Sequence, residues 1–256
     1  MQLVFISDLH LSPDTIENNR VFYKLLSTWQ DDANIDALYI LGDFFDYWLG
    51  DDDSNIFIDS MKFKLAKFTK NKPIYFITGN HDFALGKKFA KETGVIFIKD
   101  CSVINCADNQ ILLSHGDVFC TLDVAYQRMK KVLQNPILLT LLKLLPLSLR
   151  RKIKDMLEHK SSGVSNTKPK TTYHVVDESV RDIANKKLAN IVIHGHTHNP
   201  GKYWIDNKID NRIDGNVNNP NNPKDILRVE IPDWSDHKAG GYVLVRDNEV
   251  IVHNVN

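Results

Sequence analysis

The sequence predicts an α/β fold in which buried strands alternate with amphipathic helices. Short apolar runs recur along the chain, and each of them ends in a cluster of polar residues. Runs of this length, bounded by Gly, Asn, Asp or His, suit strands that are buried on both faces. The segments between the early runs carry apolar residues at helical spacing. This order of strand, helix, strand, helix and strand indicates an α/β domain.

The expected elements follow from these runs in chain order. Six runs predict strands, at residues 3–6, 37–41, 74–78, 95–98, 111–114 and 191–194. Helical spacing predicts helices over 17–30 and 56–70. Three later runs, at 226–231, 242–245 and 250–253, are expected to form antiparallel strands.

The middle of the chain has a different character. Residues 124–160 are rich in Leu and contain interleaved basic residues, a polar stretch follows to residue 172, and 173–187 returns to helical spacing. We therefore expect a core of residues 1–123 and 173–256 that carries a helical cap insertion of residues 124–172. Residues 207–224 are rich in Asn, Asp and Pro, and we expect them to form a mobile loop.

Composition limits the classes of function. Lys and Arg together number 32, as do Asp and Glu, so the net charge is zero and the basic surplus of a general nucleic-acid binder is missing. Three cysteines without a CxxC pair suit a reducing compartment. The N-terminal apolar run is too short for a signal peptide, and no apolar run is long enough to span a bilayer. We expect a cytoplasmic monomer, with contact to a membrane surface left open.

The chemical signal lies where the strands end. Five clusters follow expected strands: Asp8-x-His10, Gly42-Asp43, Gly79-Asn80-His81-Asp82, His115-Gly116-Asp117 and His194-Gly195-His196-Thr197-His198. Ligand sites of open α/β sheets lie beyond the carboxyl ends of the strands, so these clusters should meet at one rim. A single cluster is compatible with an ordinary strand end or a hydrogen-bonded histidine pair. Five clusters in order favour a metal site, because carboxylate, carboxamide and imidazole groups are ligands of Mn²⁺, Fe²⁺, Zn²⁺ and Mg²⁺. Burying so many polar groups without partners would be costly, and a metal would remove that cost.

In these blocks the chain resembles the calcineurin-like metallophosphoesterase superfamily. The resemblance implies a four-layer αββα sandwich with two metal ions. It places Asp8, His10, Asp43 and His198 on one ion and Asp43, Asn80, His115 and His196 on the other, so that Asp43 bridges them. Two such ions activate a hydroxide for in-line attack on phosphorus. His81 adjoins a ligand and is expected to donate to the leaving oxygen or to developing phosphate charge.

Longer blocks are similar to a narrower family, the UDP-2,3-diacylglucosamine pyrophosphatases of lipid A biosynthesis. These blocks are Ala37 to Asp53, Ser114 to Asp117, Cys120 to Gln127 and Asn166 to Lys168. The resemblance implies Mn²⁺-dependent attack on the α-phosphate, which releases UMP and a diacylated glucosamine 1-phosphate at the cytoplasmic face of the inner membrane. It also implies a set of substrate contacts, namely Asn80, His81, Asp123, Ser161, Ser165, Lys168 and His196.

The sequence departs from the narrower family at three points. His81 stands where that family usually has Arg, Ser165 stands where it has Asn, and Pro232 replaces Gly in its Gly-Asp-Trp block. His81 follows the wider superfamily, so a phosphoesterase for another substrate is the alternative enzyme. A metal-binding scaffold without catalysis is the alternative from another class, although all seven expected ligands are present.

The apolar cap has two interpretations. Residues from Val132 to Leu145 are expected to form a cleft for two acyl chains, and basic residues to face anionic lipid headgroups: Lys143, Arg150, Arg151, Lys152 and Lys154. The alternative is an amphipathic helical pair with a solvated basic face. Tyr39, Trp48, Trp204 and Trp234 are expected to be packing residues.

Overall fold

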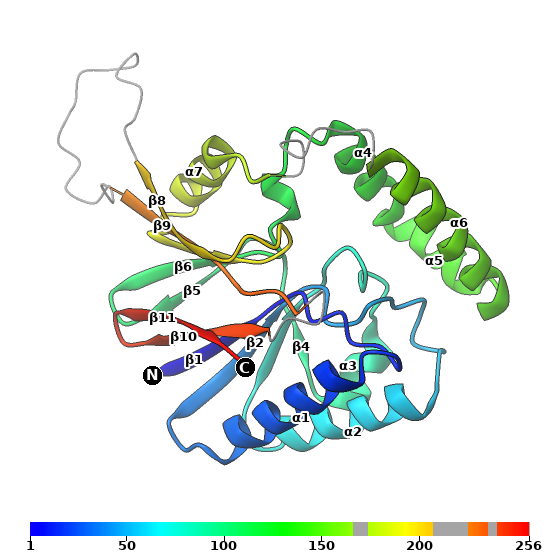
Figure 1. Ribbon diagram of the computed structural model, residues 1–256, viewed down its shortest axis with the longest axis horizontal. Coiled ribbons are helices and arrows are strands. Elements are labelled where there is room, and N and C mark those ends of the chain that lie inside the picture. Colours follow the sequence, from blue (N-terminus) through cyan, green and yellow to red (C-terminus); the bar gives the residue numbers. More distant parts are fainter. Residues whose placement is uncertain (166–173, 207–224, 235–239, 256) are drawn as a thin grey trace.

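The computed structural model describes residues 1–165, 174–206, 225–234 and 240–255, without the side chains of 157–165. Two β-sheets lie face to face between layers of helices, and a group of three helices projects from one end (Figure 1). The predicted mobile loop at 207–224 and the predicted substrate contact Lys168 lie outside the described residues.

The first sheet has six strands in the order β11-β10-β1-β2-β3-β4. Its parallel part contains β1 (Gln2–Ile6), β2 (Ile35–Leu41), β3 (Ile74–Ile77) and β4 (Ile96–Phe97). The crossovers between these strands are α1 (Ile16–Asp31), α2 (Ile56–Thr69) and α3 (Lys87–Thr93). Two antiparallel strands, β10 (Gly241–Arg246) and β11 (Glu249–Asn254), extend the sheet beside β1.

The second sheet has five strands in the order β5-β6-β7-β9-β8. They are β5 (Ser102–Cys106), β6 (Asn109–Leu113), β7 (Ile191–His194), β8 (Gly201–Asp206) and β9 (Asp225–Glu230). The three central strands β6, β7 and β9 run parallel, and β5 and β8 are antiparallel at the two edges. Helix α7 (Asp177–Lys186) precedes β7.

Alternation along the strands produces three separate cores. In β1, Val4 and Ile6 pack toward α1 to α3, whereas Leu3 and Phe5 pack between the sheets. In the second sheet, Leu112 of β6 and Val192 of β7 pack on the α7 side, while their neighbours along each strand pack between the sheets. Successive strand residues face opposite sides, so a continuous apolar run fills two cores at once. The predicted four-layer αββα sandwich is confirmed.

Helices α4 (Val124–Leu133), α5 (Pro136–Leu144) and α6 (Leu147–Ser165) occupy most of the expected cap, and Figure 1 shows them extending away from the sheets. Asp123 begins α4 by accepting the Tyr126 amide at 3.0 Å, and Asn135 begins α5 by accepting the Ile137 amide at 3.0 Å. The large apolar side chains of α5 are largely exposed, including Ile137 and Leu144. None of the helices in the described ranges combines the length and apolarity of a membrane span.

Some sequence predictions were wrong. The edge strands β5 and β8 were not predicted. Residues 226–231 were expected to form an antiparallel strand, but β9 is antiparallel only to β8 and pairs with β7 in parallel. Trp204, predicted to be a packing residue, lies on edge strand β8 with 71% of its surface exposed. An edge strand has no neighbour on one side, so its side chains can remain exposed.

The prediction that Arg150 faces lipid headgroups was wrong. Its side chain is 2% exposed and forms an ion pair with Asp52 in the loop after β2. Its guanidinium also donates to the carbonyls of Leu49 at 2.6 Å and Leu145 at 3.0 Å. Arg151 adds an ion pair with Asp53 at 3.1 Å. These contacts attach the beginning of α6 to the body of the protein, and for this purpose arginine is better suited than lysine because its donors form a planar fork.

We expect Arg150→Met to lower the free energy of unfolding by about 2 kcal/mol, because a charge-assisted hydrogen bond and two bonds to carbonyls are lost. Urea denaturation measures the change, and limited proteolysis should show faster cleavage within α4 to α6. The matched control is Lys152→Met on the same helix, where the side chain is exposed. Equal stability of the two variants would contradict this role of Arg150.

Candidate metal centre

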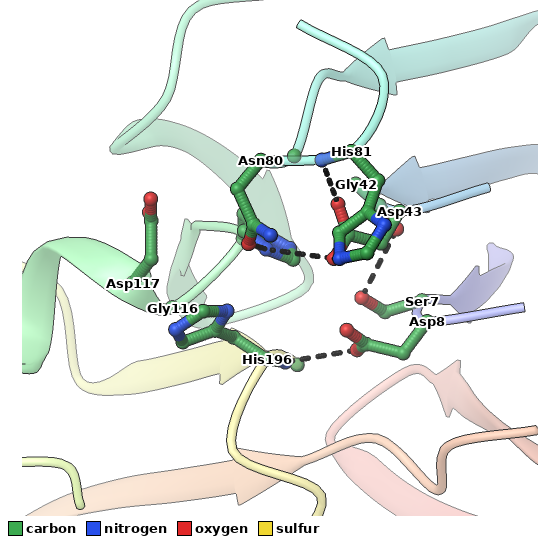
Figure 2. A network of polar contacts seen from close by, with 12 residues as sticks. Ser7, Asp8, Gly42, Asp43, Asn80, His81, Gly116, Asp117 and His196 are labelled. Atoms are coloured by element: carbon green, nitrogen blue, oxygen red, sulfur yellow. Dashed lines mark hydrogen bonds and ion pairs between the residues drawn. The ribbon is translucent and has the colours of Figure 1, made fainter. Parts of the chain in front are cut away.

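The predicted ligands follow strands of both sheets at their carboxyl ends. Asp8 and His10 come after β1, Asp43 after β2, and Asn80 and His81 after β3. His115 follows β6, while His196 and His198 follow β7. Because these strands end at the same edge of the sandwich, loops distant in the sequence meet there, and Figure 2 shows Asp8, Asp43, Asn80 and His196 around one space.

Five of these residues have a left-handed backbone conformation. The φ angles are 55° at Asp8, 47° at His10, 51° at Asp43, 78° at His196 and 52° at His198. Non-glycine residues rarely adopt positive φ, and such strained positions cost of order 1–3 kcal/mol each and gather at functional sites. This conformation turns the chain sharply after each strand, so that side chains two residues apart reach the same space.

One group of possible ligands contains Asp8, His10 and His198. Their ligand atoms lie within 4.8 Å of one another, and His198 Nε2 is 3.7 Å from Asp8 Oδ1. Asp8 Oδ2 accepts the backbone amide of His196 at 2.8 Å. Asp8 Oδ1 is buried and accepts no hydrogen bond within the described part of the chain. That oxygen therefore points toward two imidazoles and has a lone pair left for a cation.

A second group contains Asp43, His115 and His196, again within 4.8 Å. Asn80 extends it, because its Oδ1 lies 3.0 Å from His115 Nε2. The other ring nitrogen of His115 lies 3.0 Å from the carbonyl oxygen of Leu41, to which it donates. This bond fixes the tautomer and directs Nε2 toward the group, as is usual for a histidine that binds a metal.

Asp43 connects the two groups. Its Oδ2 lies 3.6 Å from His115 Nε2 in the second group and 4.0 Å from His10 Nε2 in the first. Its Oδ1 accepts the amide of His81 at 2.9 Å, which ties the loop after β3 to the loop after β2 (Figure 2). Gly79 allows this approach, because a Cβ there would overlap the carboxylate of Asp43.

The protonation states follow from burial and neighbouring charge. Burial opposes ionisation of Asp8, but the imidazoles of His198 and His115 outweigh it and hold the pKa of Asp8 below its usual value. Burial also opposes charge on His115, yet Asp43 and Asp8 raise the pKa of His115 to about 9. Burial, with His115 nearby, lowers the pKa of His196 to about 4. Asp8 and His196 are thus in the forms that bind metals, and His115 would release a proton on binding.

These residues fit a pair of divalent cations. Carboxylate, carboxamide and imidazole donors suit Mn²⁺ and similar ions. The unpartnered Asp8 Oδ1 and the clustering of imidazoles around two buried carboxylates are both expensive without a cation between them. The chemistry of the donors therefore agrees with two ions that share Asp43.

The predicted catalytic residue His81 lies beside Asp43. Its Nε2 is 4.0 Å from Asp43 Oδ2, and its Nδ1 lies 2.6 Å from the carbonyl oxygen of Asp46. The ring also contacts the rings of His10, at a centroid distance of 4.8 Å, and Tyr47, at 4.7 Å. Asp46, three residues after Asp43, was not among the predicted site residues, but it forms a third group of possible metal ligands with His10 and His81.

The predicted substrate contacts are only partly described. Asn80, His81 and His196 lie at the metal groups, and the buried Asp123 begins α4. Tyr126 of that helix lies beside His196, with ring centroids 5.9 Å apart. Ser161 and Ser165 belong to α6, but their side chains are outside the described residues, as is Lys168.

The chain is similar to proteins of one family over most of its length. A model of the calcineurin-like phosphoesterase family matches residues 1–200. The UDP-2,3-diacylglucosamine hydrolase of Photorhabdus laumondii is 40% identical over 201 residues, 78% of this chain and 83% of that protein. The protein of the same name from Pseudomonas aeruginosa is 37% identical over 235 residues, which are 91% of this chain and 91% of that protein. The one from Shewanella putrefaciens is 38% identical over 207 residues, which are 81% of this chain and 85% of that protein.

Asp82 supports the site, although it was not among the predicted site residues. It is fully buried, and its carboxylate accepts the amides of Gly79 at 2.7 Å and Phe44 at 2.9 Å. It thus joins the loop that carries Asn80 to the loop that carries Asp43. Burial, with the charge of Asp43 adding to it, raises the pKa of Asp82 to about 7.

We expect Asp82→Ala to destabilise the protein by about 2 kcal/mol or more, because two buried amides lose their acceptor. Asp82→Asn should fall between this variant and the wild type, since it keeps one acceptor oxygen. Urea denaturation of metal-free protein measures both, with the exposed Asp14→Ala as control. Wild-type stability of Asp82→Ala would refute the proposed support of the two loops.

Proposed function

The chain belongs to the calcineurin-like phosphoesterase family, and we propose that it hydrolyses the pyrophosphate bond of UDP-2,3-diacylglucosamine in lipid A biosynthesis. The products are UMP and 2,3-diacylglucosamine 1-phosphate. The observation that carries the proposal is the pair of ligand groups joined by Asp43, because such a centre suits phosphate esters and anhydrides. The substrate itself rests on the relatives, which are named for it.

Two Mn²⁺ ions would occupy the centre. Asp8, His10, Asp43 and His198 would hold one of them, and Asp43, Asn80, His115 and His196 the other. When bound, they supply charge for the phosphate oxygens and lower the pKa of a coordinated water, which provides a nucleophile at neutral pH. Because only Asp8 and Asp43 are carboxylates among the seven ligands, the loaded centre keeps positive charge for a pyrophosphate.

His81 is positioned for proton transfer at the phosphate. Its Nδ1 faces the carbonyl oxygen of Asp46, which can only accept, so Nδ1 carries a proton. Its Nε2 then faces Asp43 and, in the imidazolium form, donates a proton to the leaving oxygen or a hydrogen bond to phosphate. Asn80, His81, Asp123, Ser161, Ser165, Lys168 and His196 are proposed to line the substrate site.

The cap formed by residues 124–172 is proposed to receive the acyl chains. Its apolar side chains are exposed to 57% at Val132, 73% at Ile137 and 76% at Leu144, a large unpartnered surface for a small group of helices. Exposed Lys152 on α6 is available to anionic headgroups. These features support a cytoplasmic protein that is peripherally associated with the inner membrane.

One feature favours a second candidate function. His81 agrees with the wider superfamily and differs from the arginine usual in the narrower family, so a different nucleoside diphosphate or phosphoester is the alternative substrate. The two candidates are separated by the products: release of UMP from the diacylated UDP-sugar supports the first, and turnover of simple phosphodiesters without UMP release supports the second.

We expect the metal-free protein to release UMP from UDP-2,3-diacylglucosamine only after Mn²⁺ is added, as mass spectrometry of the products would show. Asp43→Ala should lose this activity by many orders of magnitude, since both ions lose a ligand. Near-normal kcat in Asp43→Ala would exclude a centre joined by Asp43. Failure of the wild type to turn over either this substrate or bis-p-nitrophenyl phosphate would favour a non-catalytic scaffold.

We expect His81→Ala to lower kcat roughly 100- to 10,000-fold, the range for loss of a general acid or base. Metal content, measured by elemental analysis of the purified protein, should stay close to that of the wild type. His81→Arg keeps a donor and should recover part of the activity. Loss of both metals in His81→Ala would show that the residue is a ligand or a structural element instead.

A further inference from the structure

The loop after β7, which carries His196 and His198, is held by a buried carboxylate on the neighbouring strand. Glu230, the last residue of β9, is completely buried. Its Oε1 accepts the hydroxyl of Thr197 at 2.6 Å and the backbone amide of Asn199 at 2.9 Å. These two hydrogen bonds lie immediately before and after His198, so they fix the segment on both sides of its backbone.

A single guanidinium lies close to the Glu230 carboxylate among the described residues. Arg228 is two residues earlier on β9, and its Nη1 lies 3.4 Å from Glu230 Oε2 and 3.3 Å from His194 Nε2. The guanidinium also packs over the ring of Tyr203, 4.0 Å from its centroid. An arginine so placed offsets part of the cost of burying the Glu230 carboxylate, although burial still raises the pKa of Glu230 to about 7. Oε1 remains available to the loop.

The two histidines of the loop are anchored differently. The amide of His196 donates directly to Asp8 Oδ2 at 2.8 Å, so its position is tied to another ligand. His198 also has positive φ, a strained conformation that must be held by its surroundings, and its ring Nδ1 lies 3.5 Å from Asp233 Oδ2. The bonds of Glu230 act on the residues that flank it, Thr197 and Asn199.

We propose that Glu230 is a positioning residue for the metal ion held by Asp8, His10, Asp43 and His198. The inference rests on the metal centre of the proposed function. It adds a determinant from β9, outside the residues 1–200 that match the family model. Glu230 acts through Thr197 and Asn199, and because it is fully buried and already accepts from the loop, it does not itself reach a substrate.

The loop side of the contact gives the mildest test. Thr197→Val has nearly the same shape but lacks the hydroxyl, whereas Thr197→Ser keeps it. In a Mn²⁺ titration of metal-free protein by calorimetry, we expect Thr197→Val to bind one of the two ions about 10- to 100-fold more weakly, the range for loss of a supporting contact. The other ion should bind as in the wild type, and Thr197→Ser should bind both with near wild-type affinity.

The strand side gives a second test. Glu230→Gln keeps the oxygen that accepts from Thr197 and Asn199, so its Mn²⁺ affinities should stay within about threefold of the wild type even where the melting temperature falls. Glu230→Ala should weaken the same ion as Thr197→Val. Combining Thr197→Val with Glu230→Ala should add little, because both remove one shared bond. If Glu230→Ala fails to fold, the comparison of Thr197→Val with Thr197→Ser tests the role of Glu230.

The outcomes separate the inference from the proposed function. A wild-type protein that binds no Mn²⁺ overturns both. A wild type that binds two ions, together with a Thr197→Val protein that binds both with unchanged affinity, overturns the role of Glu230 alone. Equal weakening of both ions in Thr197→Val would also contradict it, because a general loosening of the loop would not select the ion of His198.

Discussion

Two buried carboxylates among imidazoles set the main electrostatic constraint on this fold. Asp8 and Asp43 are almost inaccessible to solvent, yet each lies close to histidine nitrogens from distant parts of the chain. Ionised groups at such a position require nearby positive charge. The neighbouring imidazoles supply part of it, and divalent cations, which these donors suit, would supply the rest.

The fold supplies this placement through its strand ends and then has to hold strained loops. Positive φ at five of the expected ligands is accompanied by hydrogen bonds that hold the loops. Some of the acceptors are the ligand carboxylates of Asp8 and Asp43, and others are carboxylates beneath the loops. Asp82 ties together the loops after β2 and β3, and Glu230 holds the loop after β7. Both are buried carboxylates that accept hydrogen bonds from the backbone of the ligand loops.

The projecting helices are connected to the body at two ends of the site. Asp117, which follows His115, accepts hydrogen bonds from Tyr126 at 2.6 Å and Lys130 at 2.8 Å of α4. Arg150 joins the beginning of α6 to the loop after β2. The positions of these helices, which carry exposed apolar side chains, are therefore coupled to the ligand loops.

The α/β class, most of the strands and the residues expected to bind metals can be predicted from the sequence because these features are local. A buried strand is a short apolar run, and the polar residues follow it directly. The burial of Arg150, the exposure of Trp204, the parallel pairing of β9 with β7 and the contacts of Asp82 and Glu230 with the ligand loops emerge only on folding. Each of them depends on which distant segments pair and which edges stay unpaired. Glu230 and Thr197 are 33 residues apart, and no periodicity or motif links them until the strands pair.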